Sequence, residues 1–443
     1  MNHTILLILV ICGPVMADDT GLRFSLDDTR DEDGRTPLVT PWRVVELDPE
    51  YGGQWAVAAD LDGDGAPEIV SAENFNERDV HYTSAVVAQK LDGTVLWRWG
   101  NPDIGRKAWH HDVACQIHDW DGNGQADVIV CDEGALVEID GRTGEEKRRI
   151  AIEKEASDCL VFCDLSGKGR PTDALVKDRY KQIWAYNQLG QLLWTVNRPG
   201  GYRTAHQPVP IDIDGDGRDE IIAGYAMLNH DGSERWVYAS ENIDLRRGHL
   251  DCARVLERGG APEDWRIVMT FCGANALVAV DGNGRAIWER TGHHFESINV
   301  GKLADDLPGL QLIVDIDHQP IGESPIWAFD RDGNKIGALT TNYSRHHKLI
   351  DWTGDGIAEI AVAHNRALYN TRGTRLATLD VPEEILAAVG QTERSIFTGD
   401  MDGDGIPDIL LILPTHVFIY RNTSETRPAQ PAPLGMGLNV TLY

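Results

Sequence analysis

The chain has no long hydrophobic run and no excess of basic residues, and each absence excludes a class of partner. The apolar stretch near its start, Ile5 to Met16, is shorter than the about 18 residues that a membrane-spanning helix needs. The formal net charge is −29, with 41 Lys and Arg against 70 Asp and Glu. Such a charge repels nucleic acid phosphates and anionic lipid surfaces. We therefore expect neither a nucleic-acid partner nor a membrane span.

Several familiar sequence signatures are also missing. The chain contains no G-x-S-x-G, Walker or H-E-x-x-H motif, which argues against the common designs of hydrolases, nucleotide-binding proteins and metalloproteases. No C-x-x-C pair occurs among the seven cysteines, so we do not expect a thiolate zinc site. The six cysteines beyond residue 17 are compatible with disulfides and equally with buried thiols.

The first 17 residues have the pattern of a secretory signal. Val15 and Ala17 place small residues three and one positions before a cut at Asp18. We expect cleavage near Ala17 and a secreted or periplasmic protein. Beyond this signal, 1–17, the sequence divides into a leader over 18–40, a repeat region over 41–423 and a tail over 424–443.

One acidic loop motif recurs along the repeat region. The segment Asp60-Leu61-Asp62-Gly63-Asp64-Gly65, followed by Glu68, returns around Asp212 and Asp400, and variants start at Asp119, Asp351 and, more weakly, Asp164. Aligning the apolar segments places two copies without the acids near Glu257 and Asp305. Successive copies are 45–59 residues apart, and short β-branched and aromatic runs with Asp-Gly and Asn-Gly turns fill each interval. This spacing predicts an all-β propeller of about eight four-stranded blades, with seven as the alternative.

The ring also needs a strand to complete its last blade. The segment Trp42 to Leu47 stands before Asp60 at the distance where the fourth strand of a unit lies elsewhere in the chain. We expect it to pair with the last unit and to leave no exposed sheet edge.

The repeated loops predict structural calcium sites. Glycines let the backbone coil tightly, so that side chains at loop positions one, three and five converge and a carboxylate at position nine closes the cage. Hard oxygen ligands in this number suit Ca²⁺. The loop with Lys168 at position five is not expected to bind, because its ammonium would take the place of the cation. The predicted ligands are Asp60, Asp62, Asp64, Glu68, Asp119, Asp121, Asn123, Asp127, Asp212, Asp214, Asp216, Glu220, Asp351, Thr353, Asp355, Glu359, Asp400, Asp402, Asp404 and Asp408.

This pattern resembles the FG-GAP or VCBS repeat family, whose members form propellers with calcium in these loops. The resemblance covers nearly the whole chain beyond residue 17 and implies a fold and a metal, but no single activity. More loosely, the chain is similar to propeller polysaccharide lyases, namely the rhamnogalacturonan lyases of polysaccharide lyase family eleven and the ulvan lyases. That similarity implies cleavage of an acidic, uronate-containing polysaccharide by β-elimination.

Basic and titratable residues gather in the segments that enter the innermost strands, which should meet at one end of the central channel. β-Elimination needs a cation for the uronate carboxylate, a base for the C5 proton and an acid for the leaving oxygen. We assign Arg203 or Arg246 to the carboxylate, His110 or His111 to the base and Tyr202 or His206 to the acid. The full set of candidates is His110, His111, Tyr202, Arg203, His206, Arg246, His249, His294, Arg345 and His347.

Two alternatives remain open from the sequence. Imidazoles that converge on the axis could hold Zn²⁺ or Mn²⁺, alone or as part of a lyase site. The same end of the channel could instead be a non-catalytic surface for glycan or protein, with Trp55, Trp109 and Tyr202 as recognition residues. The sequence predicts no oligomeric state.

Overall fold

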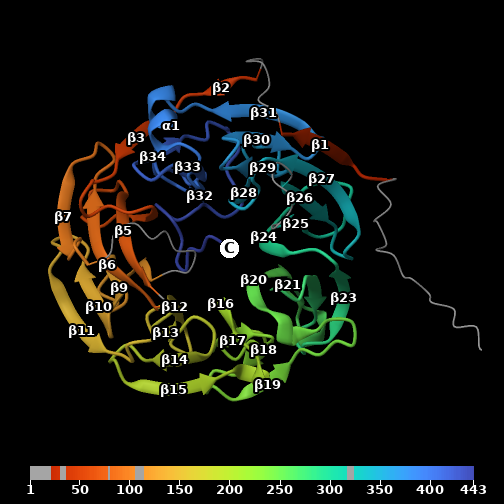
Figure 1. Cartoon of the computed structure of the whole chain (residues 1–443), viewed down its shortest axis with the longest axis horizontal. Helices are drawn as coiled ribbons and strands as arrows, with labels where there is room; N and C mark the ends of the chain where they lie inside the picture. Colours follow the sequence, from red (N-terminus) through yellow and green to blue (C-terminus); the bar gives the residue numbers. More distant parts are fainter. Residues whose placement is uncertain (1–20, 30–35, 78–79, 105–113, 317–323) are drawn as a thin grey trace, which may run out of the picture.

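The computed structural model describes residues 21–29, 36–77, 80–104, 114–316 and 324–443. Eight β-sheets radiate from a central axis and close into a ring (Figure 1). This arrangement confirms the predicted propeller with eight blades rather than seven. The predicted signal segment, 1–17, lies outside the described residues.

Each blade runs outward from the axis through four strands. The innermost strands are β4 (Trp55–Ala59), β8 (Cys115–His118), β12 (Cys159–Cys163), β16 (Thr204–Ile211), β20 (His249–Glu257), β24 (Phe295–Gly301), β28 (His347–Ile350) and β32 (Ser395–Gly399). The second strands are β5 (Glu68–Glu77), β9 (Asp127–Asp132), β13 (Asp173–Lys177), β17 (Glu220–Gly224), β21 (Arg266–Cys272), β25 (Gln311–Ile316), β29 (Glu359–Val362) and β33 (Asp408–Ile412).

The third strands are β6 (Val80–Gln89), β10 (Ala135–Asp140), β14 (Gln182–Tyr186), β18 (Ala226–Leu228), β22 (Ala276–Val280), β26 (Ser324–Phe329), β30 (Ala367–Asn370) and β34 (His416–Tyr420). The outermost strands are β7 (Val95–Gly100), β11 (Glu146–Ala151), β15 (Leu192–Asn197), β19 (Glu234–Val237), β23 (Ala286–Thr291), β27 (Lys335–Thr341), β31 (Thr374–Leu379) and β3 (Arg43–Glu46).

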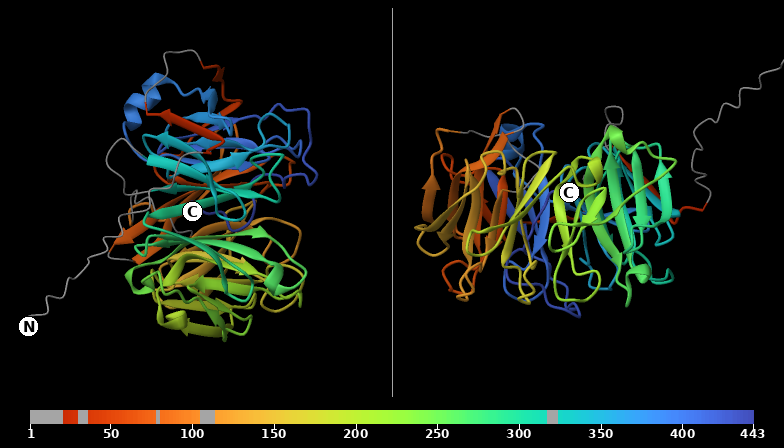
Figure 2. Two further views of the ribbon diagram at one scale, coloured as in Figure 1. Left: turned by 90° about the vertical axis from the view of Figure 1, so that its right-hand side faces the viewer. Right: turned by 90° about the horizontal axis from the view of Figure 1, so that it is seen from below.

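The outermost strand is the most exposed strand in most blades, and the sequences of the strands reflect this difference. Every residue of β12 is buried, and its sequence is the continuous apolar run Cys-Leu-Val-Phe-Cys. In the outermost strand β11, exposed residues alternate with half-buried ones, as expected where only one face packs on a neighbour. The apolar core therefore lies between successive blades. Figure 2 shows the strands crossing the thickness of the ring.

The last blade is closed by the start of the chain, as the sequence analysis expects. Strand β3 pairs antiparallel with β34, and Val45 in its centre is fully buried. Two further strands of the leader extend the outer edges of other blades: β1 (Phe24–Asp28) pairs in parallel with β27, and β2 (Leu38–Val39) pairs in parallel with β31. The leader thus wraps around the outside of the ring.

The non-strand elements are few. The described residues form one α-helix, α1 (Glu383–Val389), and three short 3₁₀ helices, η1 (Pro199–Gly201), η2 (Leu245–Arg247) and η3 (Pro262–Asp264). Within the described part of the chain, no helix is long and apolar enough to cross a membrane. The six cysteines between Cys115 and Cys272 are free thiols.

Candidate axial site

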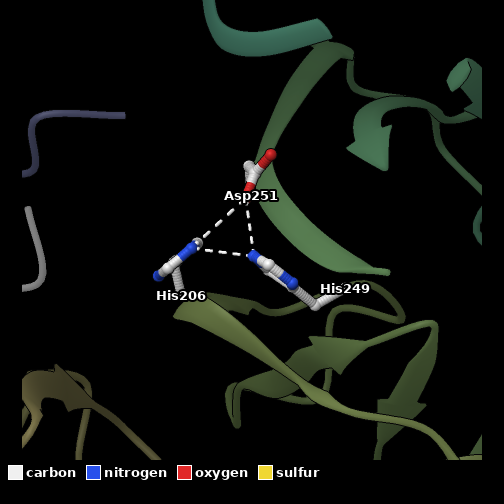
Figure 3. A group of neighbouring side chains, drawn as sticks. All are labelled: His206, His249 and Asp251. Carbon is white, nitrogen blue, oxygen red and sulfur yellow. Dashed lines mark hydrogen bonds and ion pairs between the residues drawn. The ribbon is translucent and has the colours of Figure 1, made fainter. Parts of the chain in front are cut away.

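Inner strands of two neighbouring blades bring three side chains together beside the channel (Figure 3). His206 lies on β16, and His249 and Asp251 lie on β20, where residues two apart point to the same face. The Nε2 atoms of the two histidines are 2.8 Å apart. Asp251 Oδ1 lies 3.3 Å from Nε2 of His206 and 3.0 Å from Nε2 of His249. We call these three residues the axial triad.

The axial triad is withdrawn from water. The exposed fractions of His206, His249 and Asp251 are 4%, 6% and 2%. Burial lowers the pKa of His206 well below its ordinary value, and the neighbouring His249 adds to the shift. Burial raises the pKa of Asp251 well above its ordinary value, and repulsion from Glu296 adds to it. Both shifts favour the uncharged forms, as expected for buried titratable groups.

The donor atoms of the axial triad suit a transition metal. Their separations of 2.8–3.3 Å are close to the roughly 3.3 Å between ligands that each stand about 2.0–2.1 Å from a tetrahedral zinc. Two imidazole nitrogens and one carboxylate oxygen are a donor set that Zn²⁺ and Mn²⁺ accept. A second group of possible ligands, Asp251, Cys272 and His294, shares Asp251 with the first. The residues present therefore fit a bound divalent cation.

An aromatic residue and two arginines flank the triad. The ring of Tyr180 contacts the imidazoles of His206 and His249, with centroid distances of 5.7 and 4.7 Å. The guanidinium groups of Arg203 and Arg179 lie 5.3 and 5.2 Å from the centre of the Tyr180 ring. Arg203 is exposed, so its guanidinium combines cation–π contact with access to solvent.

A buried carboxylate in the next blade connects the triad to two more candidate residues. Glu296 Oε1 accepts a hydrogen bond from His294 Nε2 at 3.0 Å, and Glu296 Oε2 lies 2.9 Å from Arg345 Nη2. Burial alone would raise the pKa of Glu296, but the hydrogen bond from His294 and the charge of Arg345 outweigh it and hold that pKa well below its usual range. Glu296 is therefore an anion that fixes both partners.

The series continues into the last blade at Glu393, which is half-buried. Tyr343 Oη donates to Glu393 Oε1 at 2.6 Å, and His346 Nε2 lies 2.8 Å from the same oxygen. Arg345 Nη1 is 3.7 Å from it. This places a phenol, an imidazole and a carboxylate within reach of one another, which is a set of groups that can transfer protons.

The opposite side of the triad carries a third charged group. Asp158 Oδ2 accepts a hydrogen bond from Lys177 Nζ at 2.6 Å, and its Oδ1 contacts His81 Nδ1. Arg179 Nη1 lies 3.7 Å from Asp158 Oδ1. The charges of Arg179, Lys177 and Asp158 all act on His206. From Asp158 to Glu393, charged and titratable groups thus follow the inner strands from the third blade to the eighth.

The remaining predicted residues lie in different surroundings. Tyr202 is half-buried with its ring 5.4 Å from that of Tyr225. Arg246 lies on η2 with an 84% exposed side chain that pairs with Asp244 at 2.9 Å. His347 is buried, its Nδ1 is 3.0 Å from the carbonyl oxygen of Ser344, and burial lowers its pKa to about 3. His110, His111 and Trp109 fall outside the described residues.

Sequence reasoning did not select Asp251, Tyr343 or Glu393. Asp251 stands six positions before Glu257, which is the same place that His206 and Arg345 occupy before Asp212 and Asp351. The spacing of the repeat could therefore have identified Asp251. Tyr343 and Glu393 do not stand at this position of the repeat. Their contact depends on how the segments that enter two neighbouring blades meet.

The acidic loops are tight turns whose first residue bonds the backbone. Asp60 accepts hydrogen bonds from the amides of Gly63 and Gly65 at 2.7 and 3.0 Å, and Asp62 accepts one from Asp64 at 3.0 Å. Gly63 and Gly65 have φ values of 78° and 87°, which favour glycine. The loops at Asp119, Asp212, Asp351 and Asp400 repeat the bonds of the first aspartate. Oxygens of Asp60, Asp62 and Glu68 converge, as the calcium prediction requires.

In four loops a basic side chain of the same blade reaches the remaining oxygens. Lys90 Nζ lies 2.7 Å from both Asp62 Oδ2 and Asp64 Oδ2. Equivalent contacts join Lys147 to Asp121 and Asp127, Arg235 to Asp214, and Arg421 to Asp402. A calcium ion would have to compete with these groups, so the calcium sites remain a prediction.

Comparison with known proteins connects this architecture to carbohydrate-active relatives. Residues 351–411 match the model of the FG-GAP-like repeat. The chain is 29% identical over 402 residues to the rhamnogalacturonan exolyase YesX of Bacillus subtilis, covering 73% of this chain and 62% of the relative. It is 26% identical over 403 residues to the rhamnogalacturonan endolyase YesW of the same organism, covering 72% of this chain and 61% of the relative. The chain thus spans less than two thirds of the length of both enzymes.

A solved structure shares the fold. The rhamnogalacturonan lyase of Bacillus licheniformis superposes with a TM-score of 0.59 at 20% identity, covering 89% of this chain and 76% of that one. The two resemblances that the sequence analysis states are confirmed. The chain is an eight-bladed β-propeller with an FG-GAP-like repeat, and it is similar in sequence to rhamnogalacturonan lyases.

Proposed function

We propose that this chain is a lyase that cleaves a rhamnogalacturonan-type acidic polysaccharide by β-elimination. The observation that supports this proposal most is the similarity to two rhamnogalacturonan lyases over 73% and 72% of the chain. The axial site agrees with it, because histidine, tyrosine, arginine and carboxylate side chains gather there. A uronate substrate is an anion, and the exposed Arg203 places a cation 5.3 Å from the ring of Tyr180, which contacts the triad.

The reaction requires three tasks at one sugar ring. A cation neutralises the uronate carboxylate, a base takes the C5 proton, and the C4–O bond then breaks with formation of a C4–C5 double bond while an acid protonates the leaving oxygen. Arg203 or Arg246 serves as the carboxylate clamp, and both are exposed. His110 or His111 serves as the base on sequence grounds alone. Tyr202 serves as the acid, and Tyr343 with Glu393 and His346 is a second proton-transferring set.

The axial triad takes a different role in this proposal from the one assigned to His206 by sequence. His206 is buried and its pKa is low, so it is a poor source of protons but a good neutral ligand. We propose that His206, His249 and Asp251 hold a divalent cation such as Zn²⁺ or Mn²⁺. A cation bound there would supply positive charge toward the substrate carboxylate.

We further propose that the acidic loops bind several calcium ions and that the chain is secreted or periplasmic. The converging oxygens of Asp60, Asp62 and Glu68 support the first part. A divalent ion attracts these carboxylates more strongly than the ammonium of Lys90 does, because it carries twice the charge. The pattern that ends at Ala17 supports the second part.

The test is an assay of the purified chain with calcium against rhamnogalacturonan, polygalacturonate and a neutral glucan. We expect near-ultraviolet absorbance from an unsaturated uronate with rhamnogalacturonan only. Asp251→Asn should lose most of this signal, whereas His230→Ala, which changes a histidine far from the axis, should retain it. Binding of a glycan without product from any substrate would favour the non-catalytic alternative and contradict the proposal.

A further inference from the structure

The last residues of the sequence lie on the central axis of the ring. In Figure 1 the C-terminal label lies at the centre of the ring, and in both views of Figure 2 it lies within the thickness of the ring. We call residues 434–443 the axial segment. This stretch belongs to the tail over 424–443, for which the sequence predicts no role. Leu442 and Tyr443 are only 5% and 6% exposed, so its end is as buried as the core.

The axial segment is attached at its start to the blades where the ring closes. Gly435 N donates to the carbonyl oxygen of Asp400 at 2.6 Å, and Met436 N donates to that of Ala58 at 2.7 Å. A Cβ at Gly435 would lie 2.3 Å from the Ala58 oxygen, and φ is 79°. Only glycine fits this approach. The segment therefore enters the channel along one defined path.

Side chains of several inner strands then hold the segment. Asn439 bonds both the amide and the carbonyl of Phe162 on β12, at 2.8 and 2.7 Å. Gln116 of β8 donates to the carbonyl oxygen of Val440 at 3.2 Å, and Gln207 of β16 donates to that of Asn439 at 3.3 Å. These bonds connect blades two, three and four to one element on the axis.

The segment ends against the axial triad. The ring of Tyr443 stacks on the imidazole of His206 with centroids 4.7 Å apart and planes inclined by 14°. Arg254 of β20 donates to the carbonyl oxygen of Tyr443. The imidazole of His206 also meets the ring of Tyr180 edge-on, with centroids 5.7 Å apart. Tyr443 and Tyr180 thus limit the rotation of the imidazole, whose Nε2 must face His249 and Asp251.

We propose that Tyr443 is a positioning residue of the axial triad and that the axial segment exists in part to deliver it. This inference rests on the proposed metal-binding role of the triad. A parallel stack fixes the plane of the His206 ring, and that plane directs the Nε2 lone pair. Residues that orient a metal ligand typically contribute 10–100-fold to affinity, so loss of the Tyr443 ring should weaken metal binding while leaving all three ligands in place.

The experiment compares Tyr443→Ala, Tyr443→Phe and Leu442→Ala in the full chain, with Co²⁺ as the probe. We expect Tyr443→Ala to weaken Co²⁺ binding by about tenfold and to change the visible absorption of the bound ion. Tyr443→Phe keeps the stack and should match the unsubstituted chain. Leu442→Ala removes neighbouring packing of the segment, so it should lower the melting temperature but keep the spectrum. Equal losses in Tyr443→Ala and Leu442→Ala, or no loss in either, would overturn the inference.

A metal-free readout separates this inference from the proposed function. The Cε1–H resonance of His206 reports the shielding of the imidazole by the stacked ring, and His206→Ala assigns it. Absence of Co²⁺ binding by the unsubstituted chain would contradict the metal site alone. A His206 resonance that Tyr443→Ala leaves unchanged would contradict the positioning role, whatever metal the chain binds.

Discussion

At the scale of single residues, Glu296 shows how the site can tolerate buried charge. Its carboxylate is 4% exposed and is contacted by His294 at 3.0 Å and by Arg345 at 2.9 Å. Asp251 instead faces the imidazoles of His206 and His249 at 3.3 and 3.0 Å, and burial together with repulsion from Glu296 moves its pKa in the opposite direction. The pKa values of two carboxylates in adjacent blades therefore shift in opposite directions because their neighbours differ.

Replacement of Glu296 by Gln should destabilise the fold. The change removes the closer of the two carboxylates beside the half-buried Arg345, since Glu393 lies 3.7 Å away, and breaking a buried ion pair typically costs about 3–5 kcal/mol. We expect urea unfolding at pH 7 to report a decrease of this size. The exposed pair of Arg23 and Asp306 provides the control, since Asp306→Asn should leave the unfolding curve unchanged.

The pH dependence of this effect follows from the direction of the shift. The pKa of Glu296 is lowered in the folded state, so its stabilisation is fully present above the unfolded value of about 4.3 and is lost as the pH falls through the folded pKa. The difference in free energy of unfolding between the unsubstituted chain and Glu296→Gln should therefore become smaller as the pH falls below about 4.3. A difference that is constant from pH 7 to pH 3 would contradict the ion-pair explanation.

At the scale of elements, a tryptophan of the outermost strand joins each of several blades to the next. Trp236 Nε1 on β19 donates to the carbonyl oxygen of Gly282 in the following blade at 3.1 Å. The indole ring also covers the turn glycine, because a Cβ at Gly284 would lie 2.6 Å from it. Trp97, Trp194 and Trp288 make the same contacts with the next blade. The Trp after each glycine turn in the sequence is therefore part of the blade interface.

Substitution of Gly284 by Ala tests this contact. The position has φ of 77° and no room for a Cβ beside Trp236, so strain and overpacking together should lower the free energy of unfolding by about 2–4 kcal/mol. Gly260→Ala is the matched control, because nothing lies within 4 Å of its Cβ position and its φ is not in the left-handed region. Equal stability of the two variants would show that the indole does not constrain the turn.

The elements were predictable from the sequence because each blade repeats the same local chemistry. The acidic loop, the two strands beside it and the glycine turn are all encoded within about 50 residues. The loops near Glu257 and Asp305 have lost the repeated acids. The apolar strands next to them are kept, as β20 before the first loop and β25 after the second. The sequence also predicted that Trp42 to Leu47 pairs with the last blade, because one unit lacked a fourth strand of its own.

The contacts across the axis were not predictable in this way. The meeting of Tyr343 with Glu393, and of Tyr443 with His206, depends on the order in which eight blades close around the channel. Residues 437–442 resemble a strand in sequence, yet they form no strand and lie on the axis beside the inner strands. Long-range closure, and not local propensity, decides where such segments go.

At the scale of the whole molecule, the charge of −29 must be held in a compact ring. Self-repulsion of this size opposes folding, and calcium in the acidic loops would offset it. We expect removal of calcium with EDTA to lower the melting temperature by several degrees, because ions that bind only the folded state stabilise it. Added Ca²⁺ should restore the original value and Na⁺ should not. An unchanged melting curve would mean that Lys90, Lys147, Arg235 and Arg421 are sufficient counter-charges.

The most direct test of the whole account is the mass of the products formed from defined rhamnogalacturonan oligosaccharides. β-Elimination splits a chain without adding water, so the two product masses should sum to the mass of the substrate, and one product should carry an unsaturated uronate. Products whose summed mass exceeds the substrate by one water would identify a hydrolase. Recovery of intact substrate at every pH and with every divalent cation would show that this propeller is not a lyase.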